Sequence, residues 1–289
     1  MEILQLLISG ISQGCVYGLI ALGFVLIYKA TEMVNFAQGD LMMMGAFFAY
    51  TYANVLEFPF LIAVLATIAT MALIGVMTER LLLRPMIGEP HFSVLMLTIG
   101  LGFILRAIAG ASWGNEPRSL NTPYAGGVID LNGVILGYEN LVIMIGTALL
   151  CALLYCFFRF TRLGIAMQAA SQNQLAAFYV GIPVKRIYAI VWGISASISA
   201  VAGILVAPVS LIDPQMGFIG IKAFAAAIVG GFGSLPGAIL GGLLIGVVEQ
   251  FAGLYLPTGF SDVSAYIILL VMLLIRPQGI FATMQQKKV

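Results

Sequence analysis

Long apolar segments follow one another along almost the whole chain, and they constrain the possible fold more than any other feature. A helix of about 20 mainly apolar residues can cross the hydrocarbon core of a bilayer. Suitable segments lie at roughly 6–28, 40–56, 60–83, 93–110, 140–158, 187–209, 236–256 and 262–276. A shorter glycine-rich stretch, 218–232, contains Lys222 and is predicted to be a partial or broken span. The segments predict an all-α integral membrane protein, a polytopic bundle of eight or nine transmembrane helices in one domain, 1–289.

The composition supports a helical membrane protein and argues against other classes. Of the 289 residues, 61% are hydrophobic and 9% are charged, whereas about a quarter of a soluble domain is charged. The formal net charge of +1 offers no field that would attract nucleic acid. A membrane barrel would show apolar and polar residues alternating over segments of about ten residues, and this pattern is absent.

The distribution of lysine and arginine predicts the orientation, because cytoplasmic loops are enriched in basic residues. One set of loops holds ten of the thirteen basic residues: Lys29, Arg80, Arg84, Arg159, Arg162, Lys185, Arg186, Arg276, Lys287 and Lys288. The opposite loops hold only Arg118, in a segment at 111–139 that is rich in turn residues and is expected to form turns and short strands. This pattern predicts an outer N-terminus and an inner C-terminus, with nine crossings if 218–232 counts as one.

Polar or glycine-rich residues interrupt the apolar segments at three places: Asn35–Asp40, Pro208–Gly220 and Gly230–Gly237. Irregular backbone at membrane depth is tolerated only where it is buried in protein or lines a cavity, and matching broken helices in two halves indicate a transport site. The first two interruptions follow apolar segments of opposite predicted direction, which predicts an inverted repeat of 1–110 and 187–289. Plain turns between helices are the alternative. The candidate pathway and gate residues are Asn35, Phe36, Gln38, Gly39, Asp40, Gly217, Phe218, Gly230, Gly231, Gly233 and Ser234.

Few ionisable residues fall in the apolar segments, so each is a candidate functional group. Asp40 is expected mainly to cap a helix that begins near Leu41, where a carboxylate meets the positive end of the helix dipole. Arg106 is expected to extend to the membrane surface from a helix end, and Glu249 could pair with Lys222. Near the third interruption, Ser234 is expected to cap a helix N-terminus.

The inner segment 159–186 carries four basic residues and no acidic one. Its middle part has helix-forming residues with three- and four-residue spacing, and Gly181 followed by Ile182-Pro183 predicts the helix end. The helix is too polar to span a membrane. An amphipathic linker and a docking helix for a cytoplasmic partner are both compatible with this pattern.

The motifs of enzymes and metal sites are missing from the sequence. There is no phosphate-binding G-x-x-x-x-G-K-[ST] loop, so the chain is not expected to bind ATP in that way. The single histidine, His91, and three scattered cysteines have no metal-ligand spacing and suggest no catalytic arrangement. The sequence therefore predicts neither an enzyme nor a bound metal or cofactor.

Three runs carry a resemblance to a known family: GCVYGLIALGFVLIYKATEMVNFAQGDLMMMGAF, TRLGIAMQAASQNQLAAFYVGIPVKR and IVGGFGSLPGAILGGLLIGVVE. They resemble the permease subunits of ABC importers for branched-chain amino acids, in particular the first of the two homologous permeases of such systems. The likeness covers nearly the whole chain. It implies a pathway in the bacterial inner membrane formed with a second permease as a heterodimer, a periplasmic substrate-binding protein, and two cytoplasmic ATPase subunits that bind the ATP.

The resemblance also implies that the segment 159–186 contains the coupling helix that fits the ATPase. The matching positions are Thr161, Arg162, Leu163, Gly164, Gly181, Ile182, Lys185 and Arg186, and the polar residues Gln168, Gln172 and Asn173 lie between them. Relatives commonly carry an arginine and an acidic residue where this chain has Gln168 and Asn173. They commonly read N-F-A-H-G-E where this chain has Gln38 and Asp40.

These departures leave the substrate subclass open, since relatives move branched-chain or other amino acids, amides, urea or small carboxylates. A self-contained secondary carrier or channel is the alternative from another class. Such a carrier would explain the broken helices and the missing ATP site. It explains the acid-free cytoplasmic helix poorly.

Overall fold

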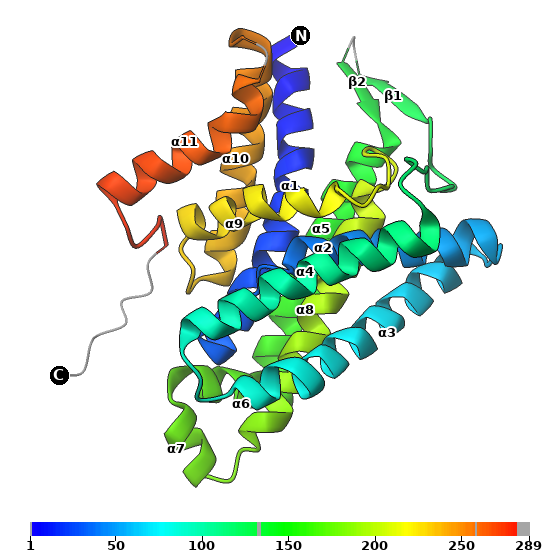
Figure 1. The fold of residues 1–289 in the computed structure, drawn as a ribbon. Helices are drawn as coiled ribbons and strands as arrows, with labels where there is room; N and C mark the ends of the chain where they lie inside the picture. Colours follow the sequence, from blue (N-terminus) through cyan, green and yellow to red (C-terminus); the bar gives the residue numbers. More distant parts are fainter. Residues whose placement is uncertain (1, 132–133, 258, 282–289) are drawn as a thin grey trace.

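The computed structural model describes residues 2–131, 134–257 and 259–281, which form a helical bundle with one short β-hairpin (Figure 1). The helices are α1 (Glu2–Thr31), α2 (Gln38–Tyr50), α3 (Phe60–Thr78), α4 (His91–Trp113), α5 (Tyr138–Phe160), α6 (Arg162–Gln172), α7 (Gln174–Tyr179), α8 (Val184–Val206), α9 (Ile219–Gly230), α10 (Leu235–Tyr255) and α11 (Phe260–Ile275). The hairpin strands are β1 (Val128–Leu131) and β2 (Val134–Gly137), paired antiparallel. The strands confirm the prediction for 111–139.

Within the described residues, six helical segments are long and apolar enough to cross a membrane. They are Ile3–Thr31, Phe60–Met86, His91–Trp113, Tyr138–Phe160, Val184–Val206 and Leu235–Tyr255. Two shorter apolar helices are Met216–Gly230 and Phe260–Ile275. The all-α membrane class is thus confirmed, and most of the stretch 218–232 lies in the shorter helix Met216–Gly230.

The long helices differ in how deeply they are buried. The most apolar part of α1 is 89% buried and that of α8 is 78% buried, whereas the corresponding part of α5 is 17% buried. A helix that is apolar all round belongs either in a protein core or against lipid. Hence α1 and α8 form the centre of the bundle, and α5 presents its apolar surface outward.

Glycines allow the central helix α1 to lie directly against α10. A Cβ added to Gly14 would lie 2.6 Å from the Leu243 Cα, and one added to Gly10 would lie 2.7 Å from the Val247 Cα. Gly242 and Gly246 of α10 face the same surface of α1 and are equally close to its backbone. Such close backbone approach is how transmembrane helices associate without a hydrophobic driving force.

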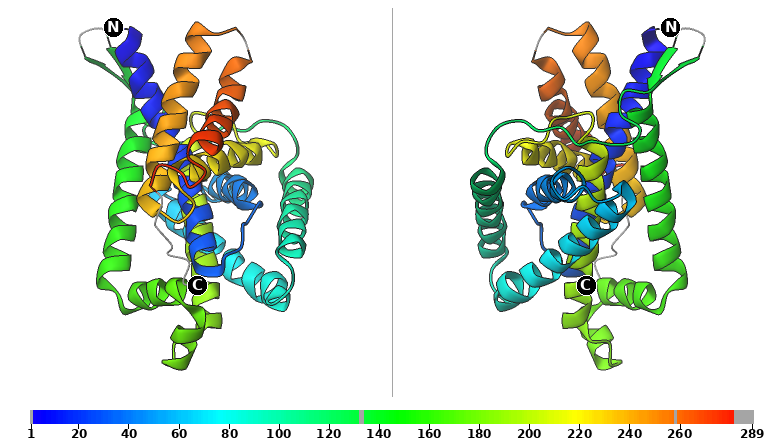
Figure 2. Two further views of the ribbon diagram at one scale, coloured as in Figure 1. Left: turned by 90° about the vertical axis from the view of Figure 1, so that its left-hand side faces the viewer. Right: turned by 90° about the vertical axis from the view of Figure 1, so that its right-hand side faces the viewer.

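The hairpin and the short helices α6 and α7 lie at opposite ends of the bundle (Figures 1 and 2). The start of α1 and the end of α10 lie near the hairpin, while α1 and α8 run in opposite directions through the centre. This separation is what the assignment of 111–139 and 159–186 to opposite membrane sides requires. We refer below to the hairpin end and the α6 end of the molecule.

Candidate functional site

The first break, residues 32–37, lies between the end of α1 and the start of α2. Thr31 Oγ1 donates to the Ile27 carbonyl at 2.8 Å, which closes the last turn of α1. Asn35 Oδ1 then accepts from the Ala37 N–H at 3.1 Å, forming the local turn that asparagine favours. The predicted interruption is therefore a true break, and its turn is held by the asparagine side chain.

Gln38 is the centre of a buried hydrogen-bond network that closes the first break against α8. Its Nε2 donates to Ser199 Oγ at 2.7 Å. Its Oε1 accepts from Asn35 Nδ2 at 3.1 Å and from Ser195 Oγ at 3.2 Å. All four side chains are fully buried, and Gly23 of α1 leaves the space that the Gln38 amide occupies. Ser195 and Ser199 were missed by the sequence analysis, although their four-residue spacing on one face of α8 was a usable signal.

The structure corrects two predictions about charged residues. Asp40 is not a helix cap: α2 has Ala37 at its N-cap without any side-chain cap, and Asp40 lies inside the first turn. Arg106 does not extend to the surface from a helix end but lies within α4, where its Nε donates to Asp40 Oδ1 at 2.6 Å. A buried carboxylate needs an opposite charge because it has lost its water. Glycines at 102 and 217 leave the room for this carboxylate, since a Cβ at either position would meet it.

The two broken helices predicted from the sequence meet in the interior. A Cβ added to Gly39 of α2 would collide with the Gly217 carbonyl oxygen, and one added to Gly220 of α9 would lie 2.6 Å from the Gly39 Cα. The N-terminal ends of α2 and α9 thus touch, with Asp40 between them. Because helix N-termini carry a partial positive charge, a carboxylate is favoured at this position.

The glycine turn, Gly230–Ser234, joins α9 to α10 at the other end of α9 from Gly217 and Phe218. Ser234 Oγ accepts from the Gly237 N–H at 3.1 Å, which confirms the predicted helix cap. Gly231 has a φ of +105°, a conformation that favours glycine. The backbones of Gly230 and Gly237 are in contact, and residues 280–281 donate hydrogen bonds to the last carbonyls of α9. Backbone contact and the residues after α11 therefore hold this turn, which lies at the opposite end of α9 from the contact with α2.

Aromatic rings connect the first break to the glycine turn. The Phe36 and Phe224 ring centroids are 5.1 Å apart, those of Phe224 and Phe232 are 5.6 Å apart, and those of Phe232 and Tyr28 are 4.7 Å apart. Phe36 was predicted as a pathway residue. Phe224, Phe232 and Tyr28 were missed, because scattered aromatics in apolar helices carry no periodic signal.

The inner segment forms two helices where the sequence predicted one. Thr161 caps α6 by accepting from the Gly164 N–H at 3.0 Å. Asn173 interrupts the helix in an extended conformation and caps α7 by accepting from the Ala176 N–H at 2.9 Å. Gly181, with a φ of +86°, follows the end of α7 as predicted. A polar residue that competes for backbone donors is the physical reason for the second helix start.

Leu163, Phe178 and Tyr179 expose large apolar or aromatic surfaces at the α6 end. Arg162, Gln172 and Lys185 are exposed beside them, whereas Gly164 is buried against the α5 backbone. The predicted coupling residues Ile182 and Arg186 lie in the connection from α7 to α8 and in the first turn of α8.

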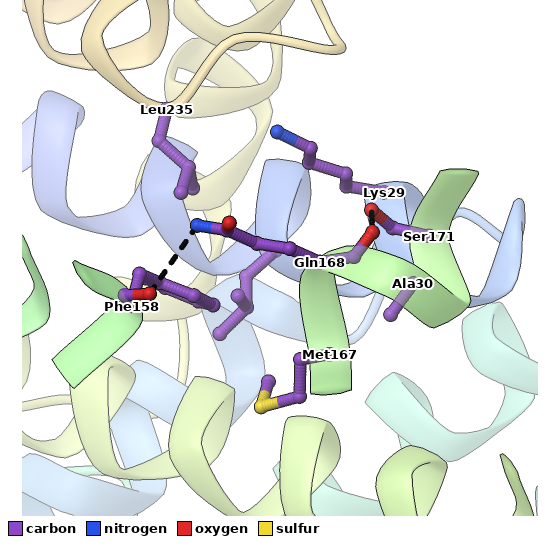
Figure 3. A pocket seen from close by; sticks show the side chains of 8 residues that line it. Lys29, Ala30, Phe158, Met167, Gln168, Ser171 and Leu235 are labelled. Atoms are coloured by element: carbon purple, nitrogen blue, oxygen red, sulfur yellow. Dashed lines mark hydrogen bonds between the residues drawn. The ribbon is translucent and has the colours of Figure 1, made fainter. Parts of the chain in front are cut away.

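A small pocket of about 30 Å³ separates α6 from the ends of α1 and α5 and the start of α10 (Figure 3). Gln168 Nε2 donates to the Phe158 carbonyl at 3.4 Å, and its amide lies between Leu235 and Phe158 (Figure 3). Lys29 of α1 and Leu235 of α10 line the same pocket. Helix α6 therefore lies across this pocket from the helix before the first break and from the helix after the glycine turn.

Lys222 pairs with Glu249, as the sequence allowed, with Nζ and Oε1 2.6 Å apart. Within the described ranges, no three histidine, cysteine, aspartate or glutamate side chains come together as a metal site.

Long apolar helices with the broken helices α2 and α9 packed among them define a polytopic integral membrane protein. Residues 6–276 match the family described as "Branched-chain amino acid transport system / permease component", and the chain belongs to this family.

Several relatives are similar over most of their lengths. The high-affinity branched-chain amino acid transport system permease protein BraD of Pseudomonas aeruginosa is 33% identical, over 99% of this chain and 98% of BraD. The corresponding protein LivH of Escherichia coli (strain K12) is 31% identical, over 99% of this chain and 97% of LivH. A probable LivH of Methanocaldococcus jannaschii is 30% identical over 91% of this chain and 87% of that protein.

The solved structure of PsaBC from Streptococcus pneumoniae in complex with Fab has a similar fold. The TM-score is 0.52, and the match covers 96% of this chain and 93% of that chain. At 14% identity the likeness concerns the fold alone.

Proposed function

We propose that the chain is the permease subunit of an ABC importer and forms part of the translocation pathway for branched-chain amino acids. Membership of the permease family and the transport function named for its relatives support this function. The observation that carries the proposal is the contact between the N-terminal ends of α2 and α9 in the buried interior. Broken helices that meet at the centre of a bundle are a recurrent way of building a transport site.

The proposed topology has nine membrane segments, α1 to α5 and α8 to α11, of which α2 and α9 are the broken ones. Their order supports an inverted repeat, because a long helix is followed by a break and a short helix in both α1–α2 and α8–α9. The opposite directions of α1 and α8 agree with this relation (Figure 1). In the proposed orientation in the bacterial inner membrane, the hairpin end faces the periplasm and the α6 end faces the cytoplasm. The basic loops support this orientation.

The proposed partners are a second homologous permease, two cytoplasmic ATPase subunits and a periplasmic substrate-binding protein. The exposed Leu163, Phe178 and Tyr179 support docking of the ATPase on α6 and α7, since they are apolar surface at an end that would face water. ATP would be bound by the ATPase subunits, and this chain would need no cofactor of its own. Lipid would cover the outer helices such as α5.

In the proposed mechanism, movement of the ATPase displaces α6, and the pocket beside Gln168 transmits the displacement to α1 and α10. The described conformation has the Gln38 network closed, with Asn35 and Gln38 withdrawn from solvent. Alternating access would require this network to open while the two permeases rock against each other. Gly39, Gly217 and Phe218 would then line the opened path, and the glycine turn would act as the hinge after α9.

Transport in proteoliposomes tests the proposal. The chain reconstituted with its permease, ATPase and binding-protein partners should take up L-leucine in an ATP-dependent manner, and the chain alone should not. Uptake by the chain alone would instead identify a self-contained carrier or channel. Uptake of urea, amides or small carboxylates in preference to leucine would reassign the substrate.

The docking assignment has its own test. Gly164→Val places a side chain against the Phe157 carbonyl, and Gly181→Val strains a residue at positive φ. Both variants should lower ATPase assembly and uptake together. Gly100→Val, which meets no atom within 4 Å, is the matched control. Normal ATPase coupling in both variants would contradict the assignment.

A further inference from the structure

An open pocket of about 370 Å³ lies at the hairpin-end side of α9, between the start of α9 and the start of α11. Gln215, Phe218, Ile221, Lys222, Asp262 and Tyr266 line it. The volume is within the range of small-molecule sites, and such sites combine an apolar lining with a few polar groups that fix orientation. Nothing in the proposed gating at the first break uses Lys222, Asp262 or Tyr266.

At the pocket, one lysine ammonium group is paired with two carboxylates. Lys222 Nζ is 2.6 Å from Glu249 Oε1 and 2.8 Å from Asp262 Oδ1. The other oxygen of Glu249 accepts from the Tyr17 hydroxyl at 2.6 Å, so both Glu249 oxygens are engaged. One lysine and two carboxylates leave the network with a net charge of −1 when all are ionised.

The two ion pairs of Lys222 differ in solvent exposure, and only the more exposed pair can open readily to bind a ligand. The Glu249 side chain is 12% exposed, whereas that of Asp262 is 74% exposed. An exposed ion pair contributes little to stability, but breaking a buried one leaves an uncompensated charge. The pair between Lys222 and Asp262 can therefore open toward the pocket while Glu249 holds the lysine in place.

We infer that this pocket is a holding site for an amino-acid zwitterion on the outer side of the pathway. The ligand carboxylate would replace Asp262 at Lys222, and the ligand ammonium group would bind the released Asp262 carboxylate. This exchange replaces the pair between Lys222 and Asp262 with two pairs to the ligand, so neither charged group is left without a partner. Phe218, Ile221 and Tyr266 supply apolar surface for a branched side chain.

The pocket lies next to the ion pair at the contact between the broken helices. Phe218 lines the pocket, and the Arg106 guanidinium lies 4.0 Å from the centroid of its ring. Arg106 in turn holds Asp40 at the meeting point of α2 and α9. A zwitterion leaving the pocket past Phe218 would thus reach a second pair of opposite charges. The inference rests on the proposed function for the direction of this movement, but the binding chemistry stands on the pocket alone.

Uptake of L-leucine by the complete transporter in proteoliposomes is the first test. Asp262→Asn removes the ammonium partner at an exposed position, and we expect about a tenfold lower kcat/KM, the loss typical of one charged hydrogen bond. Asp262→Glu should restore uptake to near that of the unchanged transporter. Glu116→Gln removes another exposed carboxylate from the outer loop and should have no effect. Unchanged uptake with Asp262→Asn would overturn the inference.

Protection of a cysteine in the pocket from chemical labelling tests the holding site separately from the proposed function. With the three native cysteines replaced by alanine, Tyr266→Cys can be labelled with a charged methanethiosulfonate reagent. L-leucine should slow the labelling, whereas isovalerate and isopentylamine, which each lack one charged group, should not. Leucine uptake without protection would overturn the holding site alone. Protection without leucine uptake would overturn the proposed function and leave the site standing.

Discussion

The first break and the glycine turn both interrupt helices, and they are closed by different physical means. At the first break, Gln38 joins Asn35, Ser195 and Ser199 through side-chain hydrogen bonds. At the glycine turn, backbone lies directly on backbone, because Gly230 and Gly237 carry no side chains. Hydrogen bonds between side chains can be replaced by hydrogen bonds to water or to a ligand. A steric contact is lost only when the two backbone segments move apart. On this difference rests our proposal that the first break opens and that the glycine turn pivots.

The largest effect is expected at the ion pair beside the first break. Arg106→Met leaves the buried Asp40 carboxylate without its counter-charge, and we expect the free energy of unfolding in detergent to fall by about 4 kcal/mol. The double variant Asp40→Asn/Arg106→Met should recover much of this loss, because no buried charge remains. Equal losses in the single and double variants would show that the pair does not secure α2.

A bulky side chain at the glycine turn tests steric closure. Gly237→Leu would place its Cβ against the Gly230 carbonyl, and overpacking of this kind costs about 3 kcal/mol. Uptake and ATP hydrolysis should fall together, since the pivot is displaced. Gly100→Leu, in open space on α4, controls for the change of residue type. Normal uptake by Gly237→Leu would show that the backbone contact between Gly230 and Gly237 does not close the glycine turn.

Removal of the central amide tests closure by hydrogen bonds. Gln38→Leu keeps the approximate side-chain size but leaves buried polar partners unpaired, at a cost of about 2 kcal/mol in unfolding free energy. ATP hydrolysis without substrate should rise severalfold while uptake falls, because the closed conformation is no longer held. If hydrolysis and uptake instead fell in parallel, as expected for Gly237→Leu, the two regions would not differ in role.

The smallest effect is expected at the cap of α10. Ser234→Ala removes the acceptor for the Gly237 N–H, and loss of such a cap typically costs about 1 kcal/mol. Uptake should be nearly unchanged, because the backbone contact at the glycine turn remains. Comparing the thermal unfolding of Ser234→Ala with that of Ser234→Thr, which keeps a hydroxyl, measures how much the capping hydrogen bond contributes to stability. A large loss of uptake in Ser234→Ala alone would mean that the side chain, not the backbone, closes this region.

The sequence predicted several local features correctly where a residue type acts through its own backbone, although the Asp40 cap was wrong and the helix start at Asn173 was missed. The first break, the Ser234 cap and the end of the inner helical segment at Gly181 all follow from capping and glycine chemistry. Predictions that needed a partner from another helix were less complete. The pairing of Lys222 with Glu249 was anticipated, but Arg106 and Asp40 were assigned separate roles although they bind each other.

The sequence by itself determined the membrane class, the family resemblance and the positions of the helix interruptions, because apolar length, motif order and turn residues are properties of neighbouring positions. Only the tertiary structure decided that α2 and α9 meet at Gly39 and Gly217, and that two serines of α8 close the first break. Gln38 and Ser199 are 161 positions apart in the chain. Helix periodicity relates residues within one helix, and contacts across such a distance depend on how the helices pack.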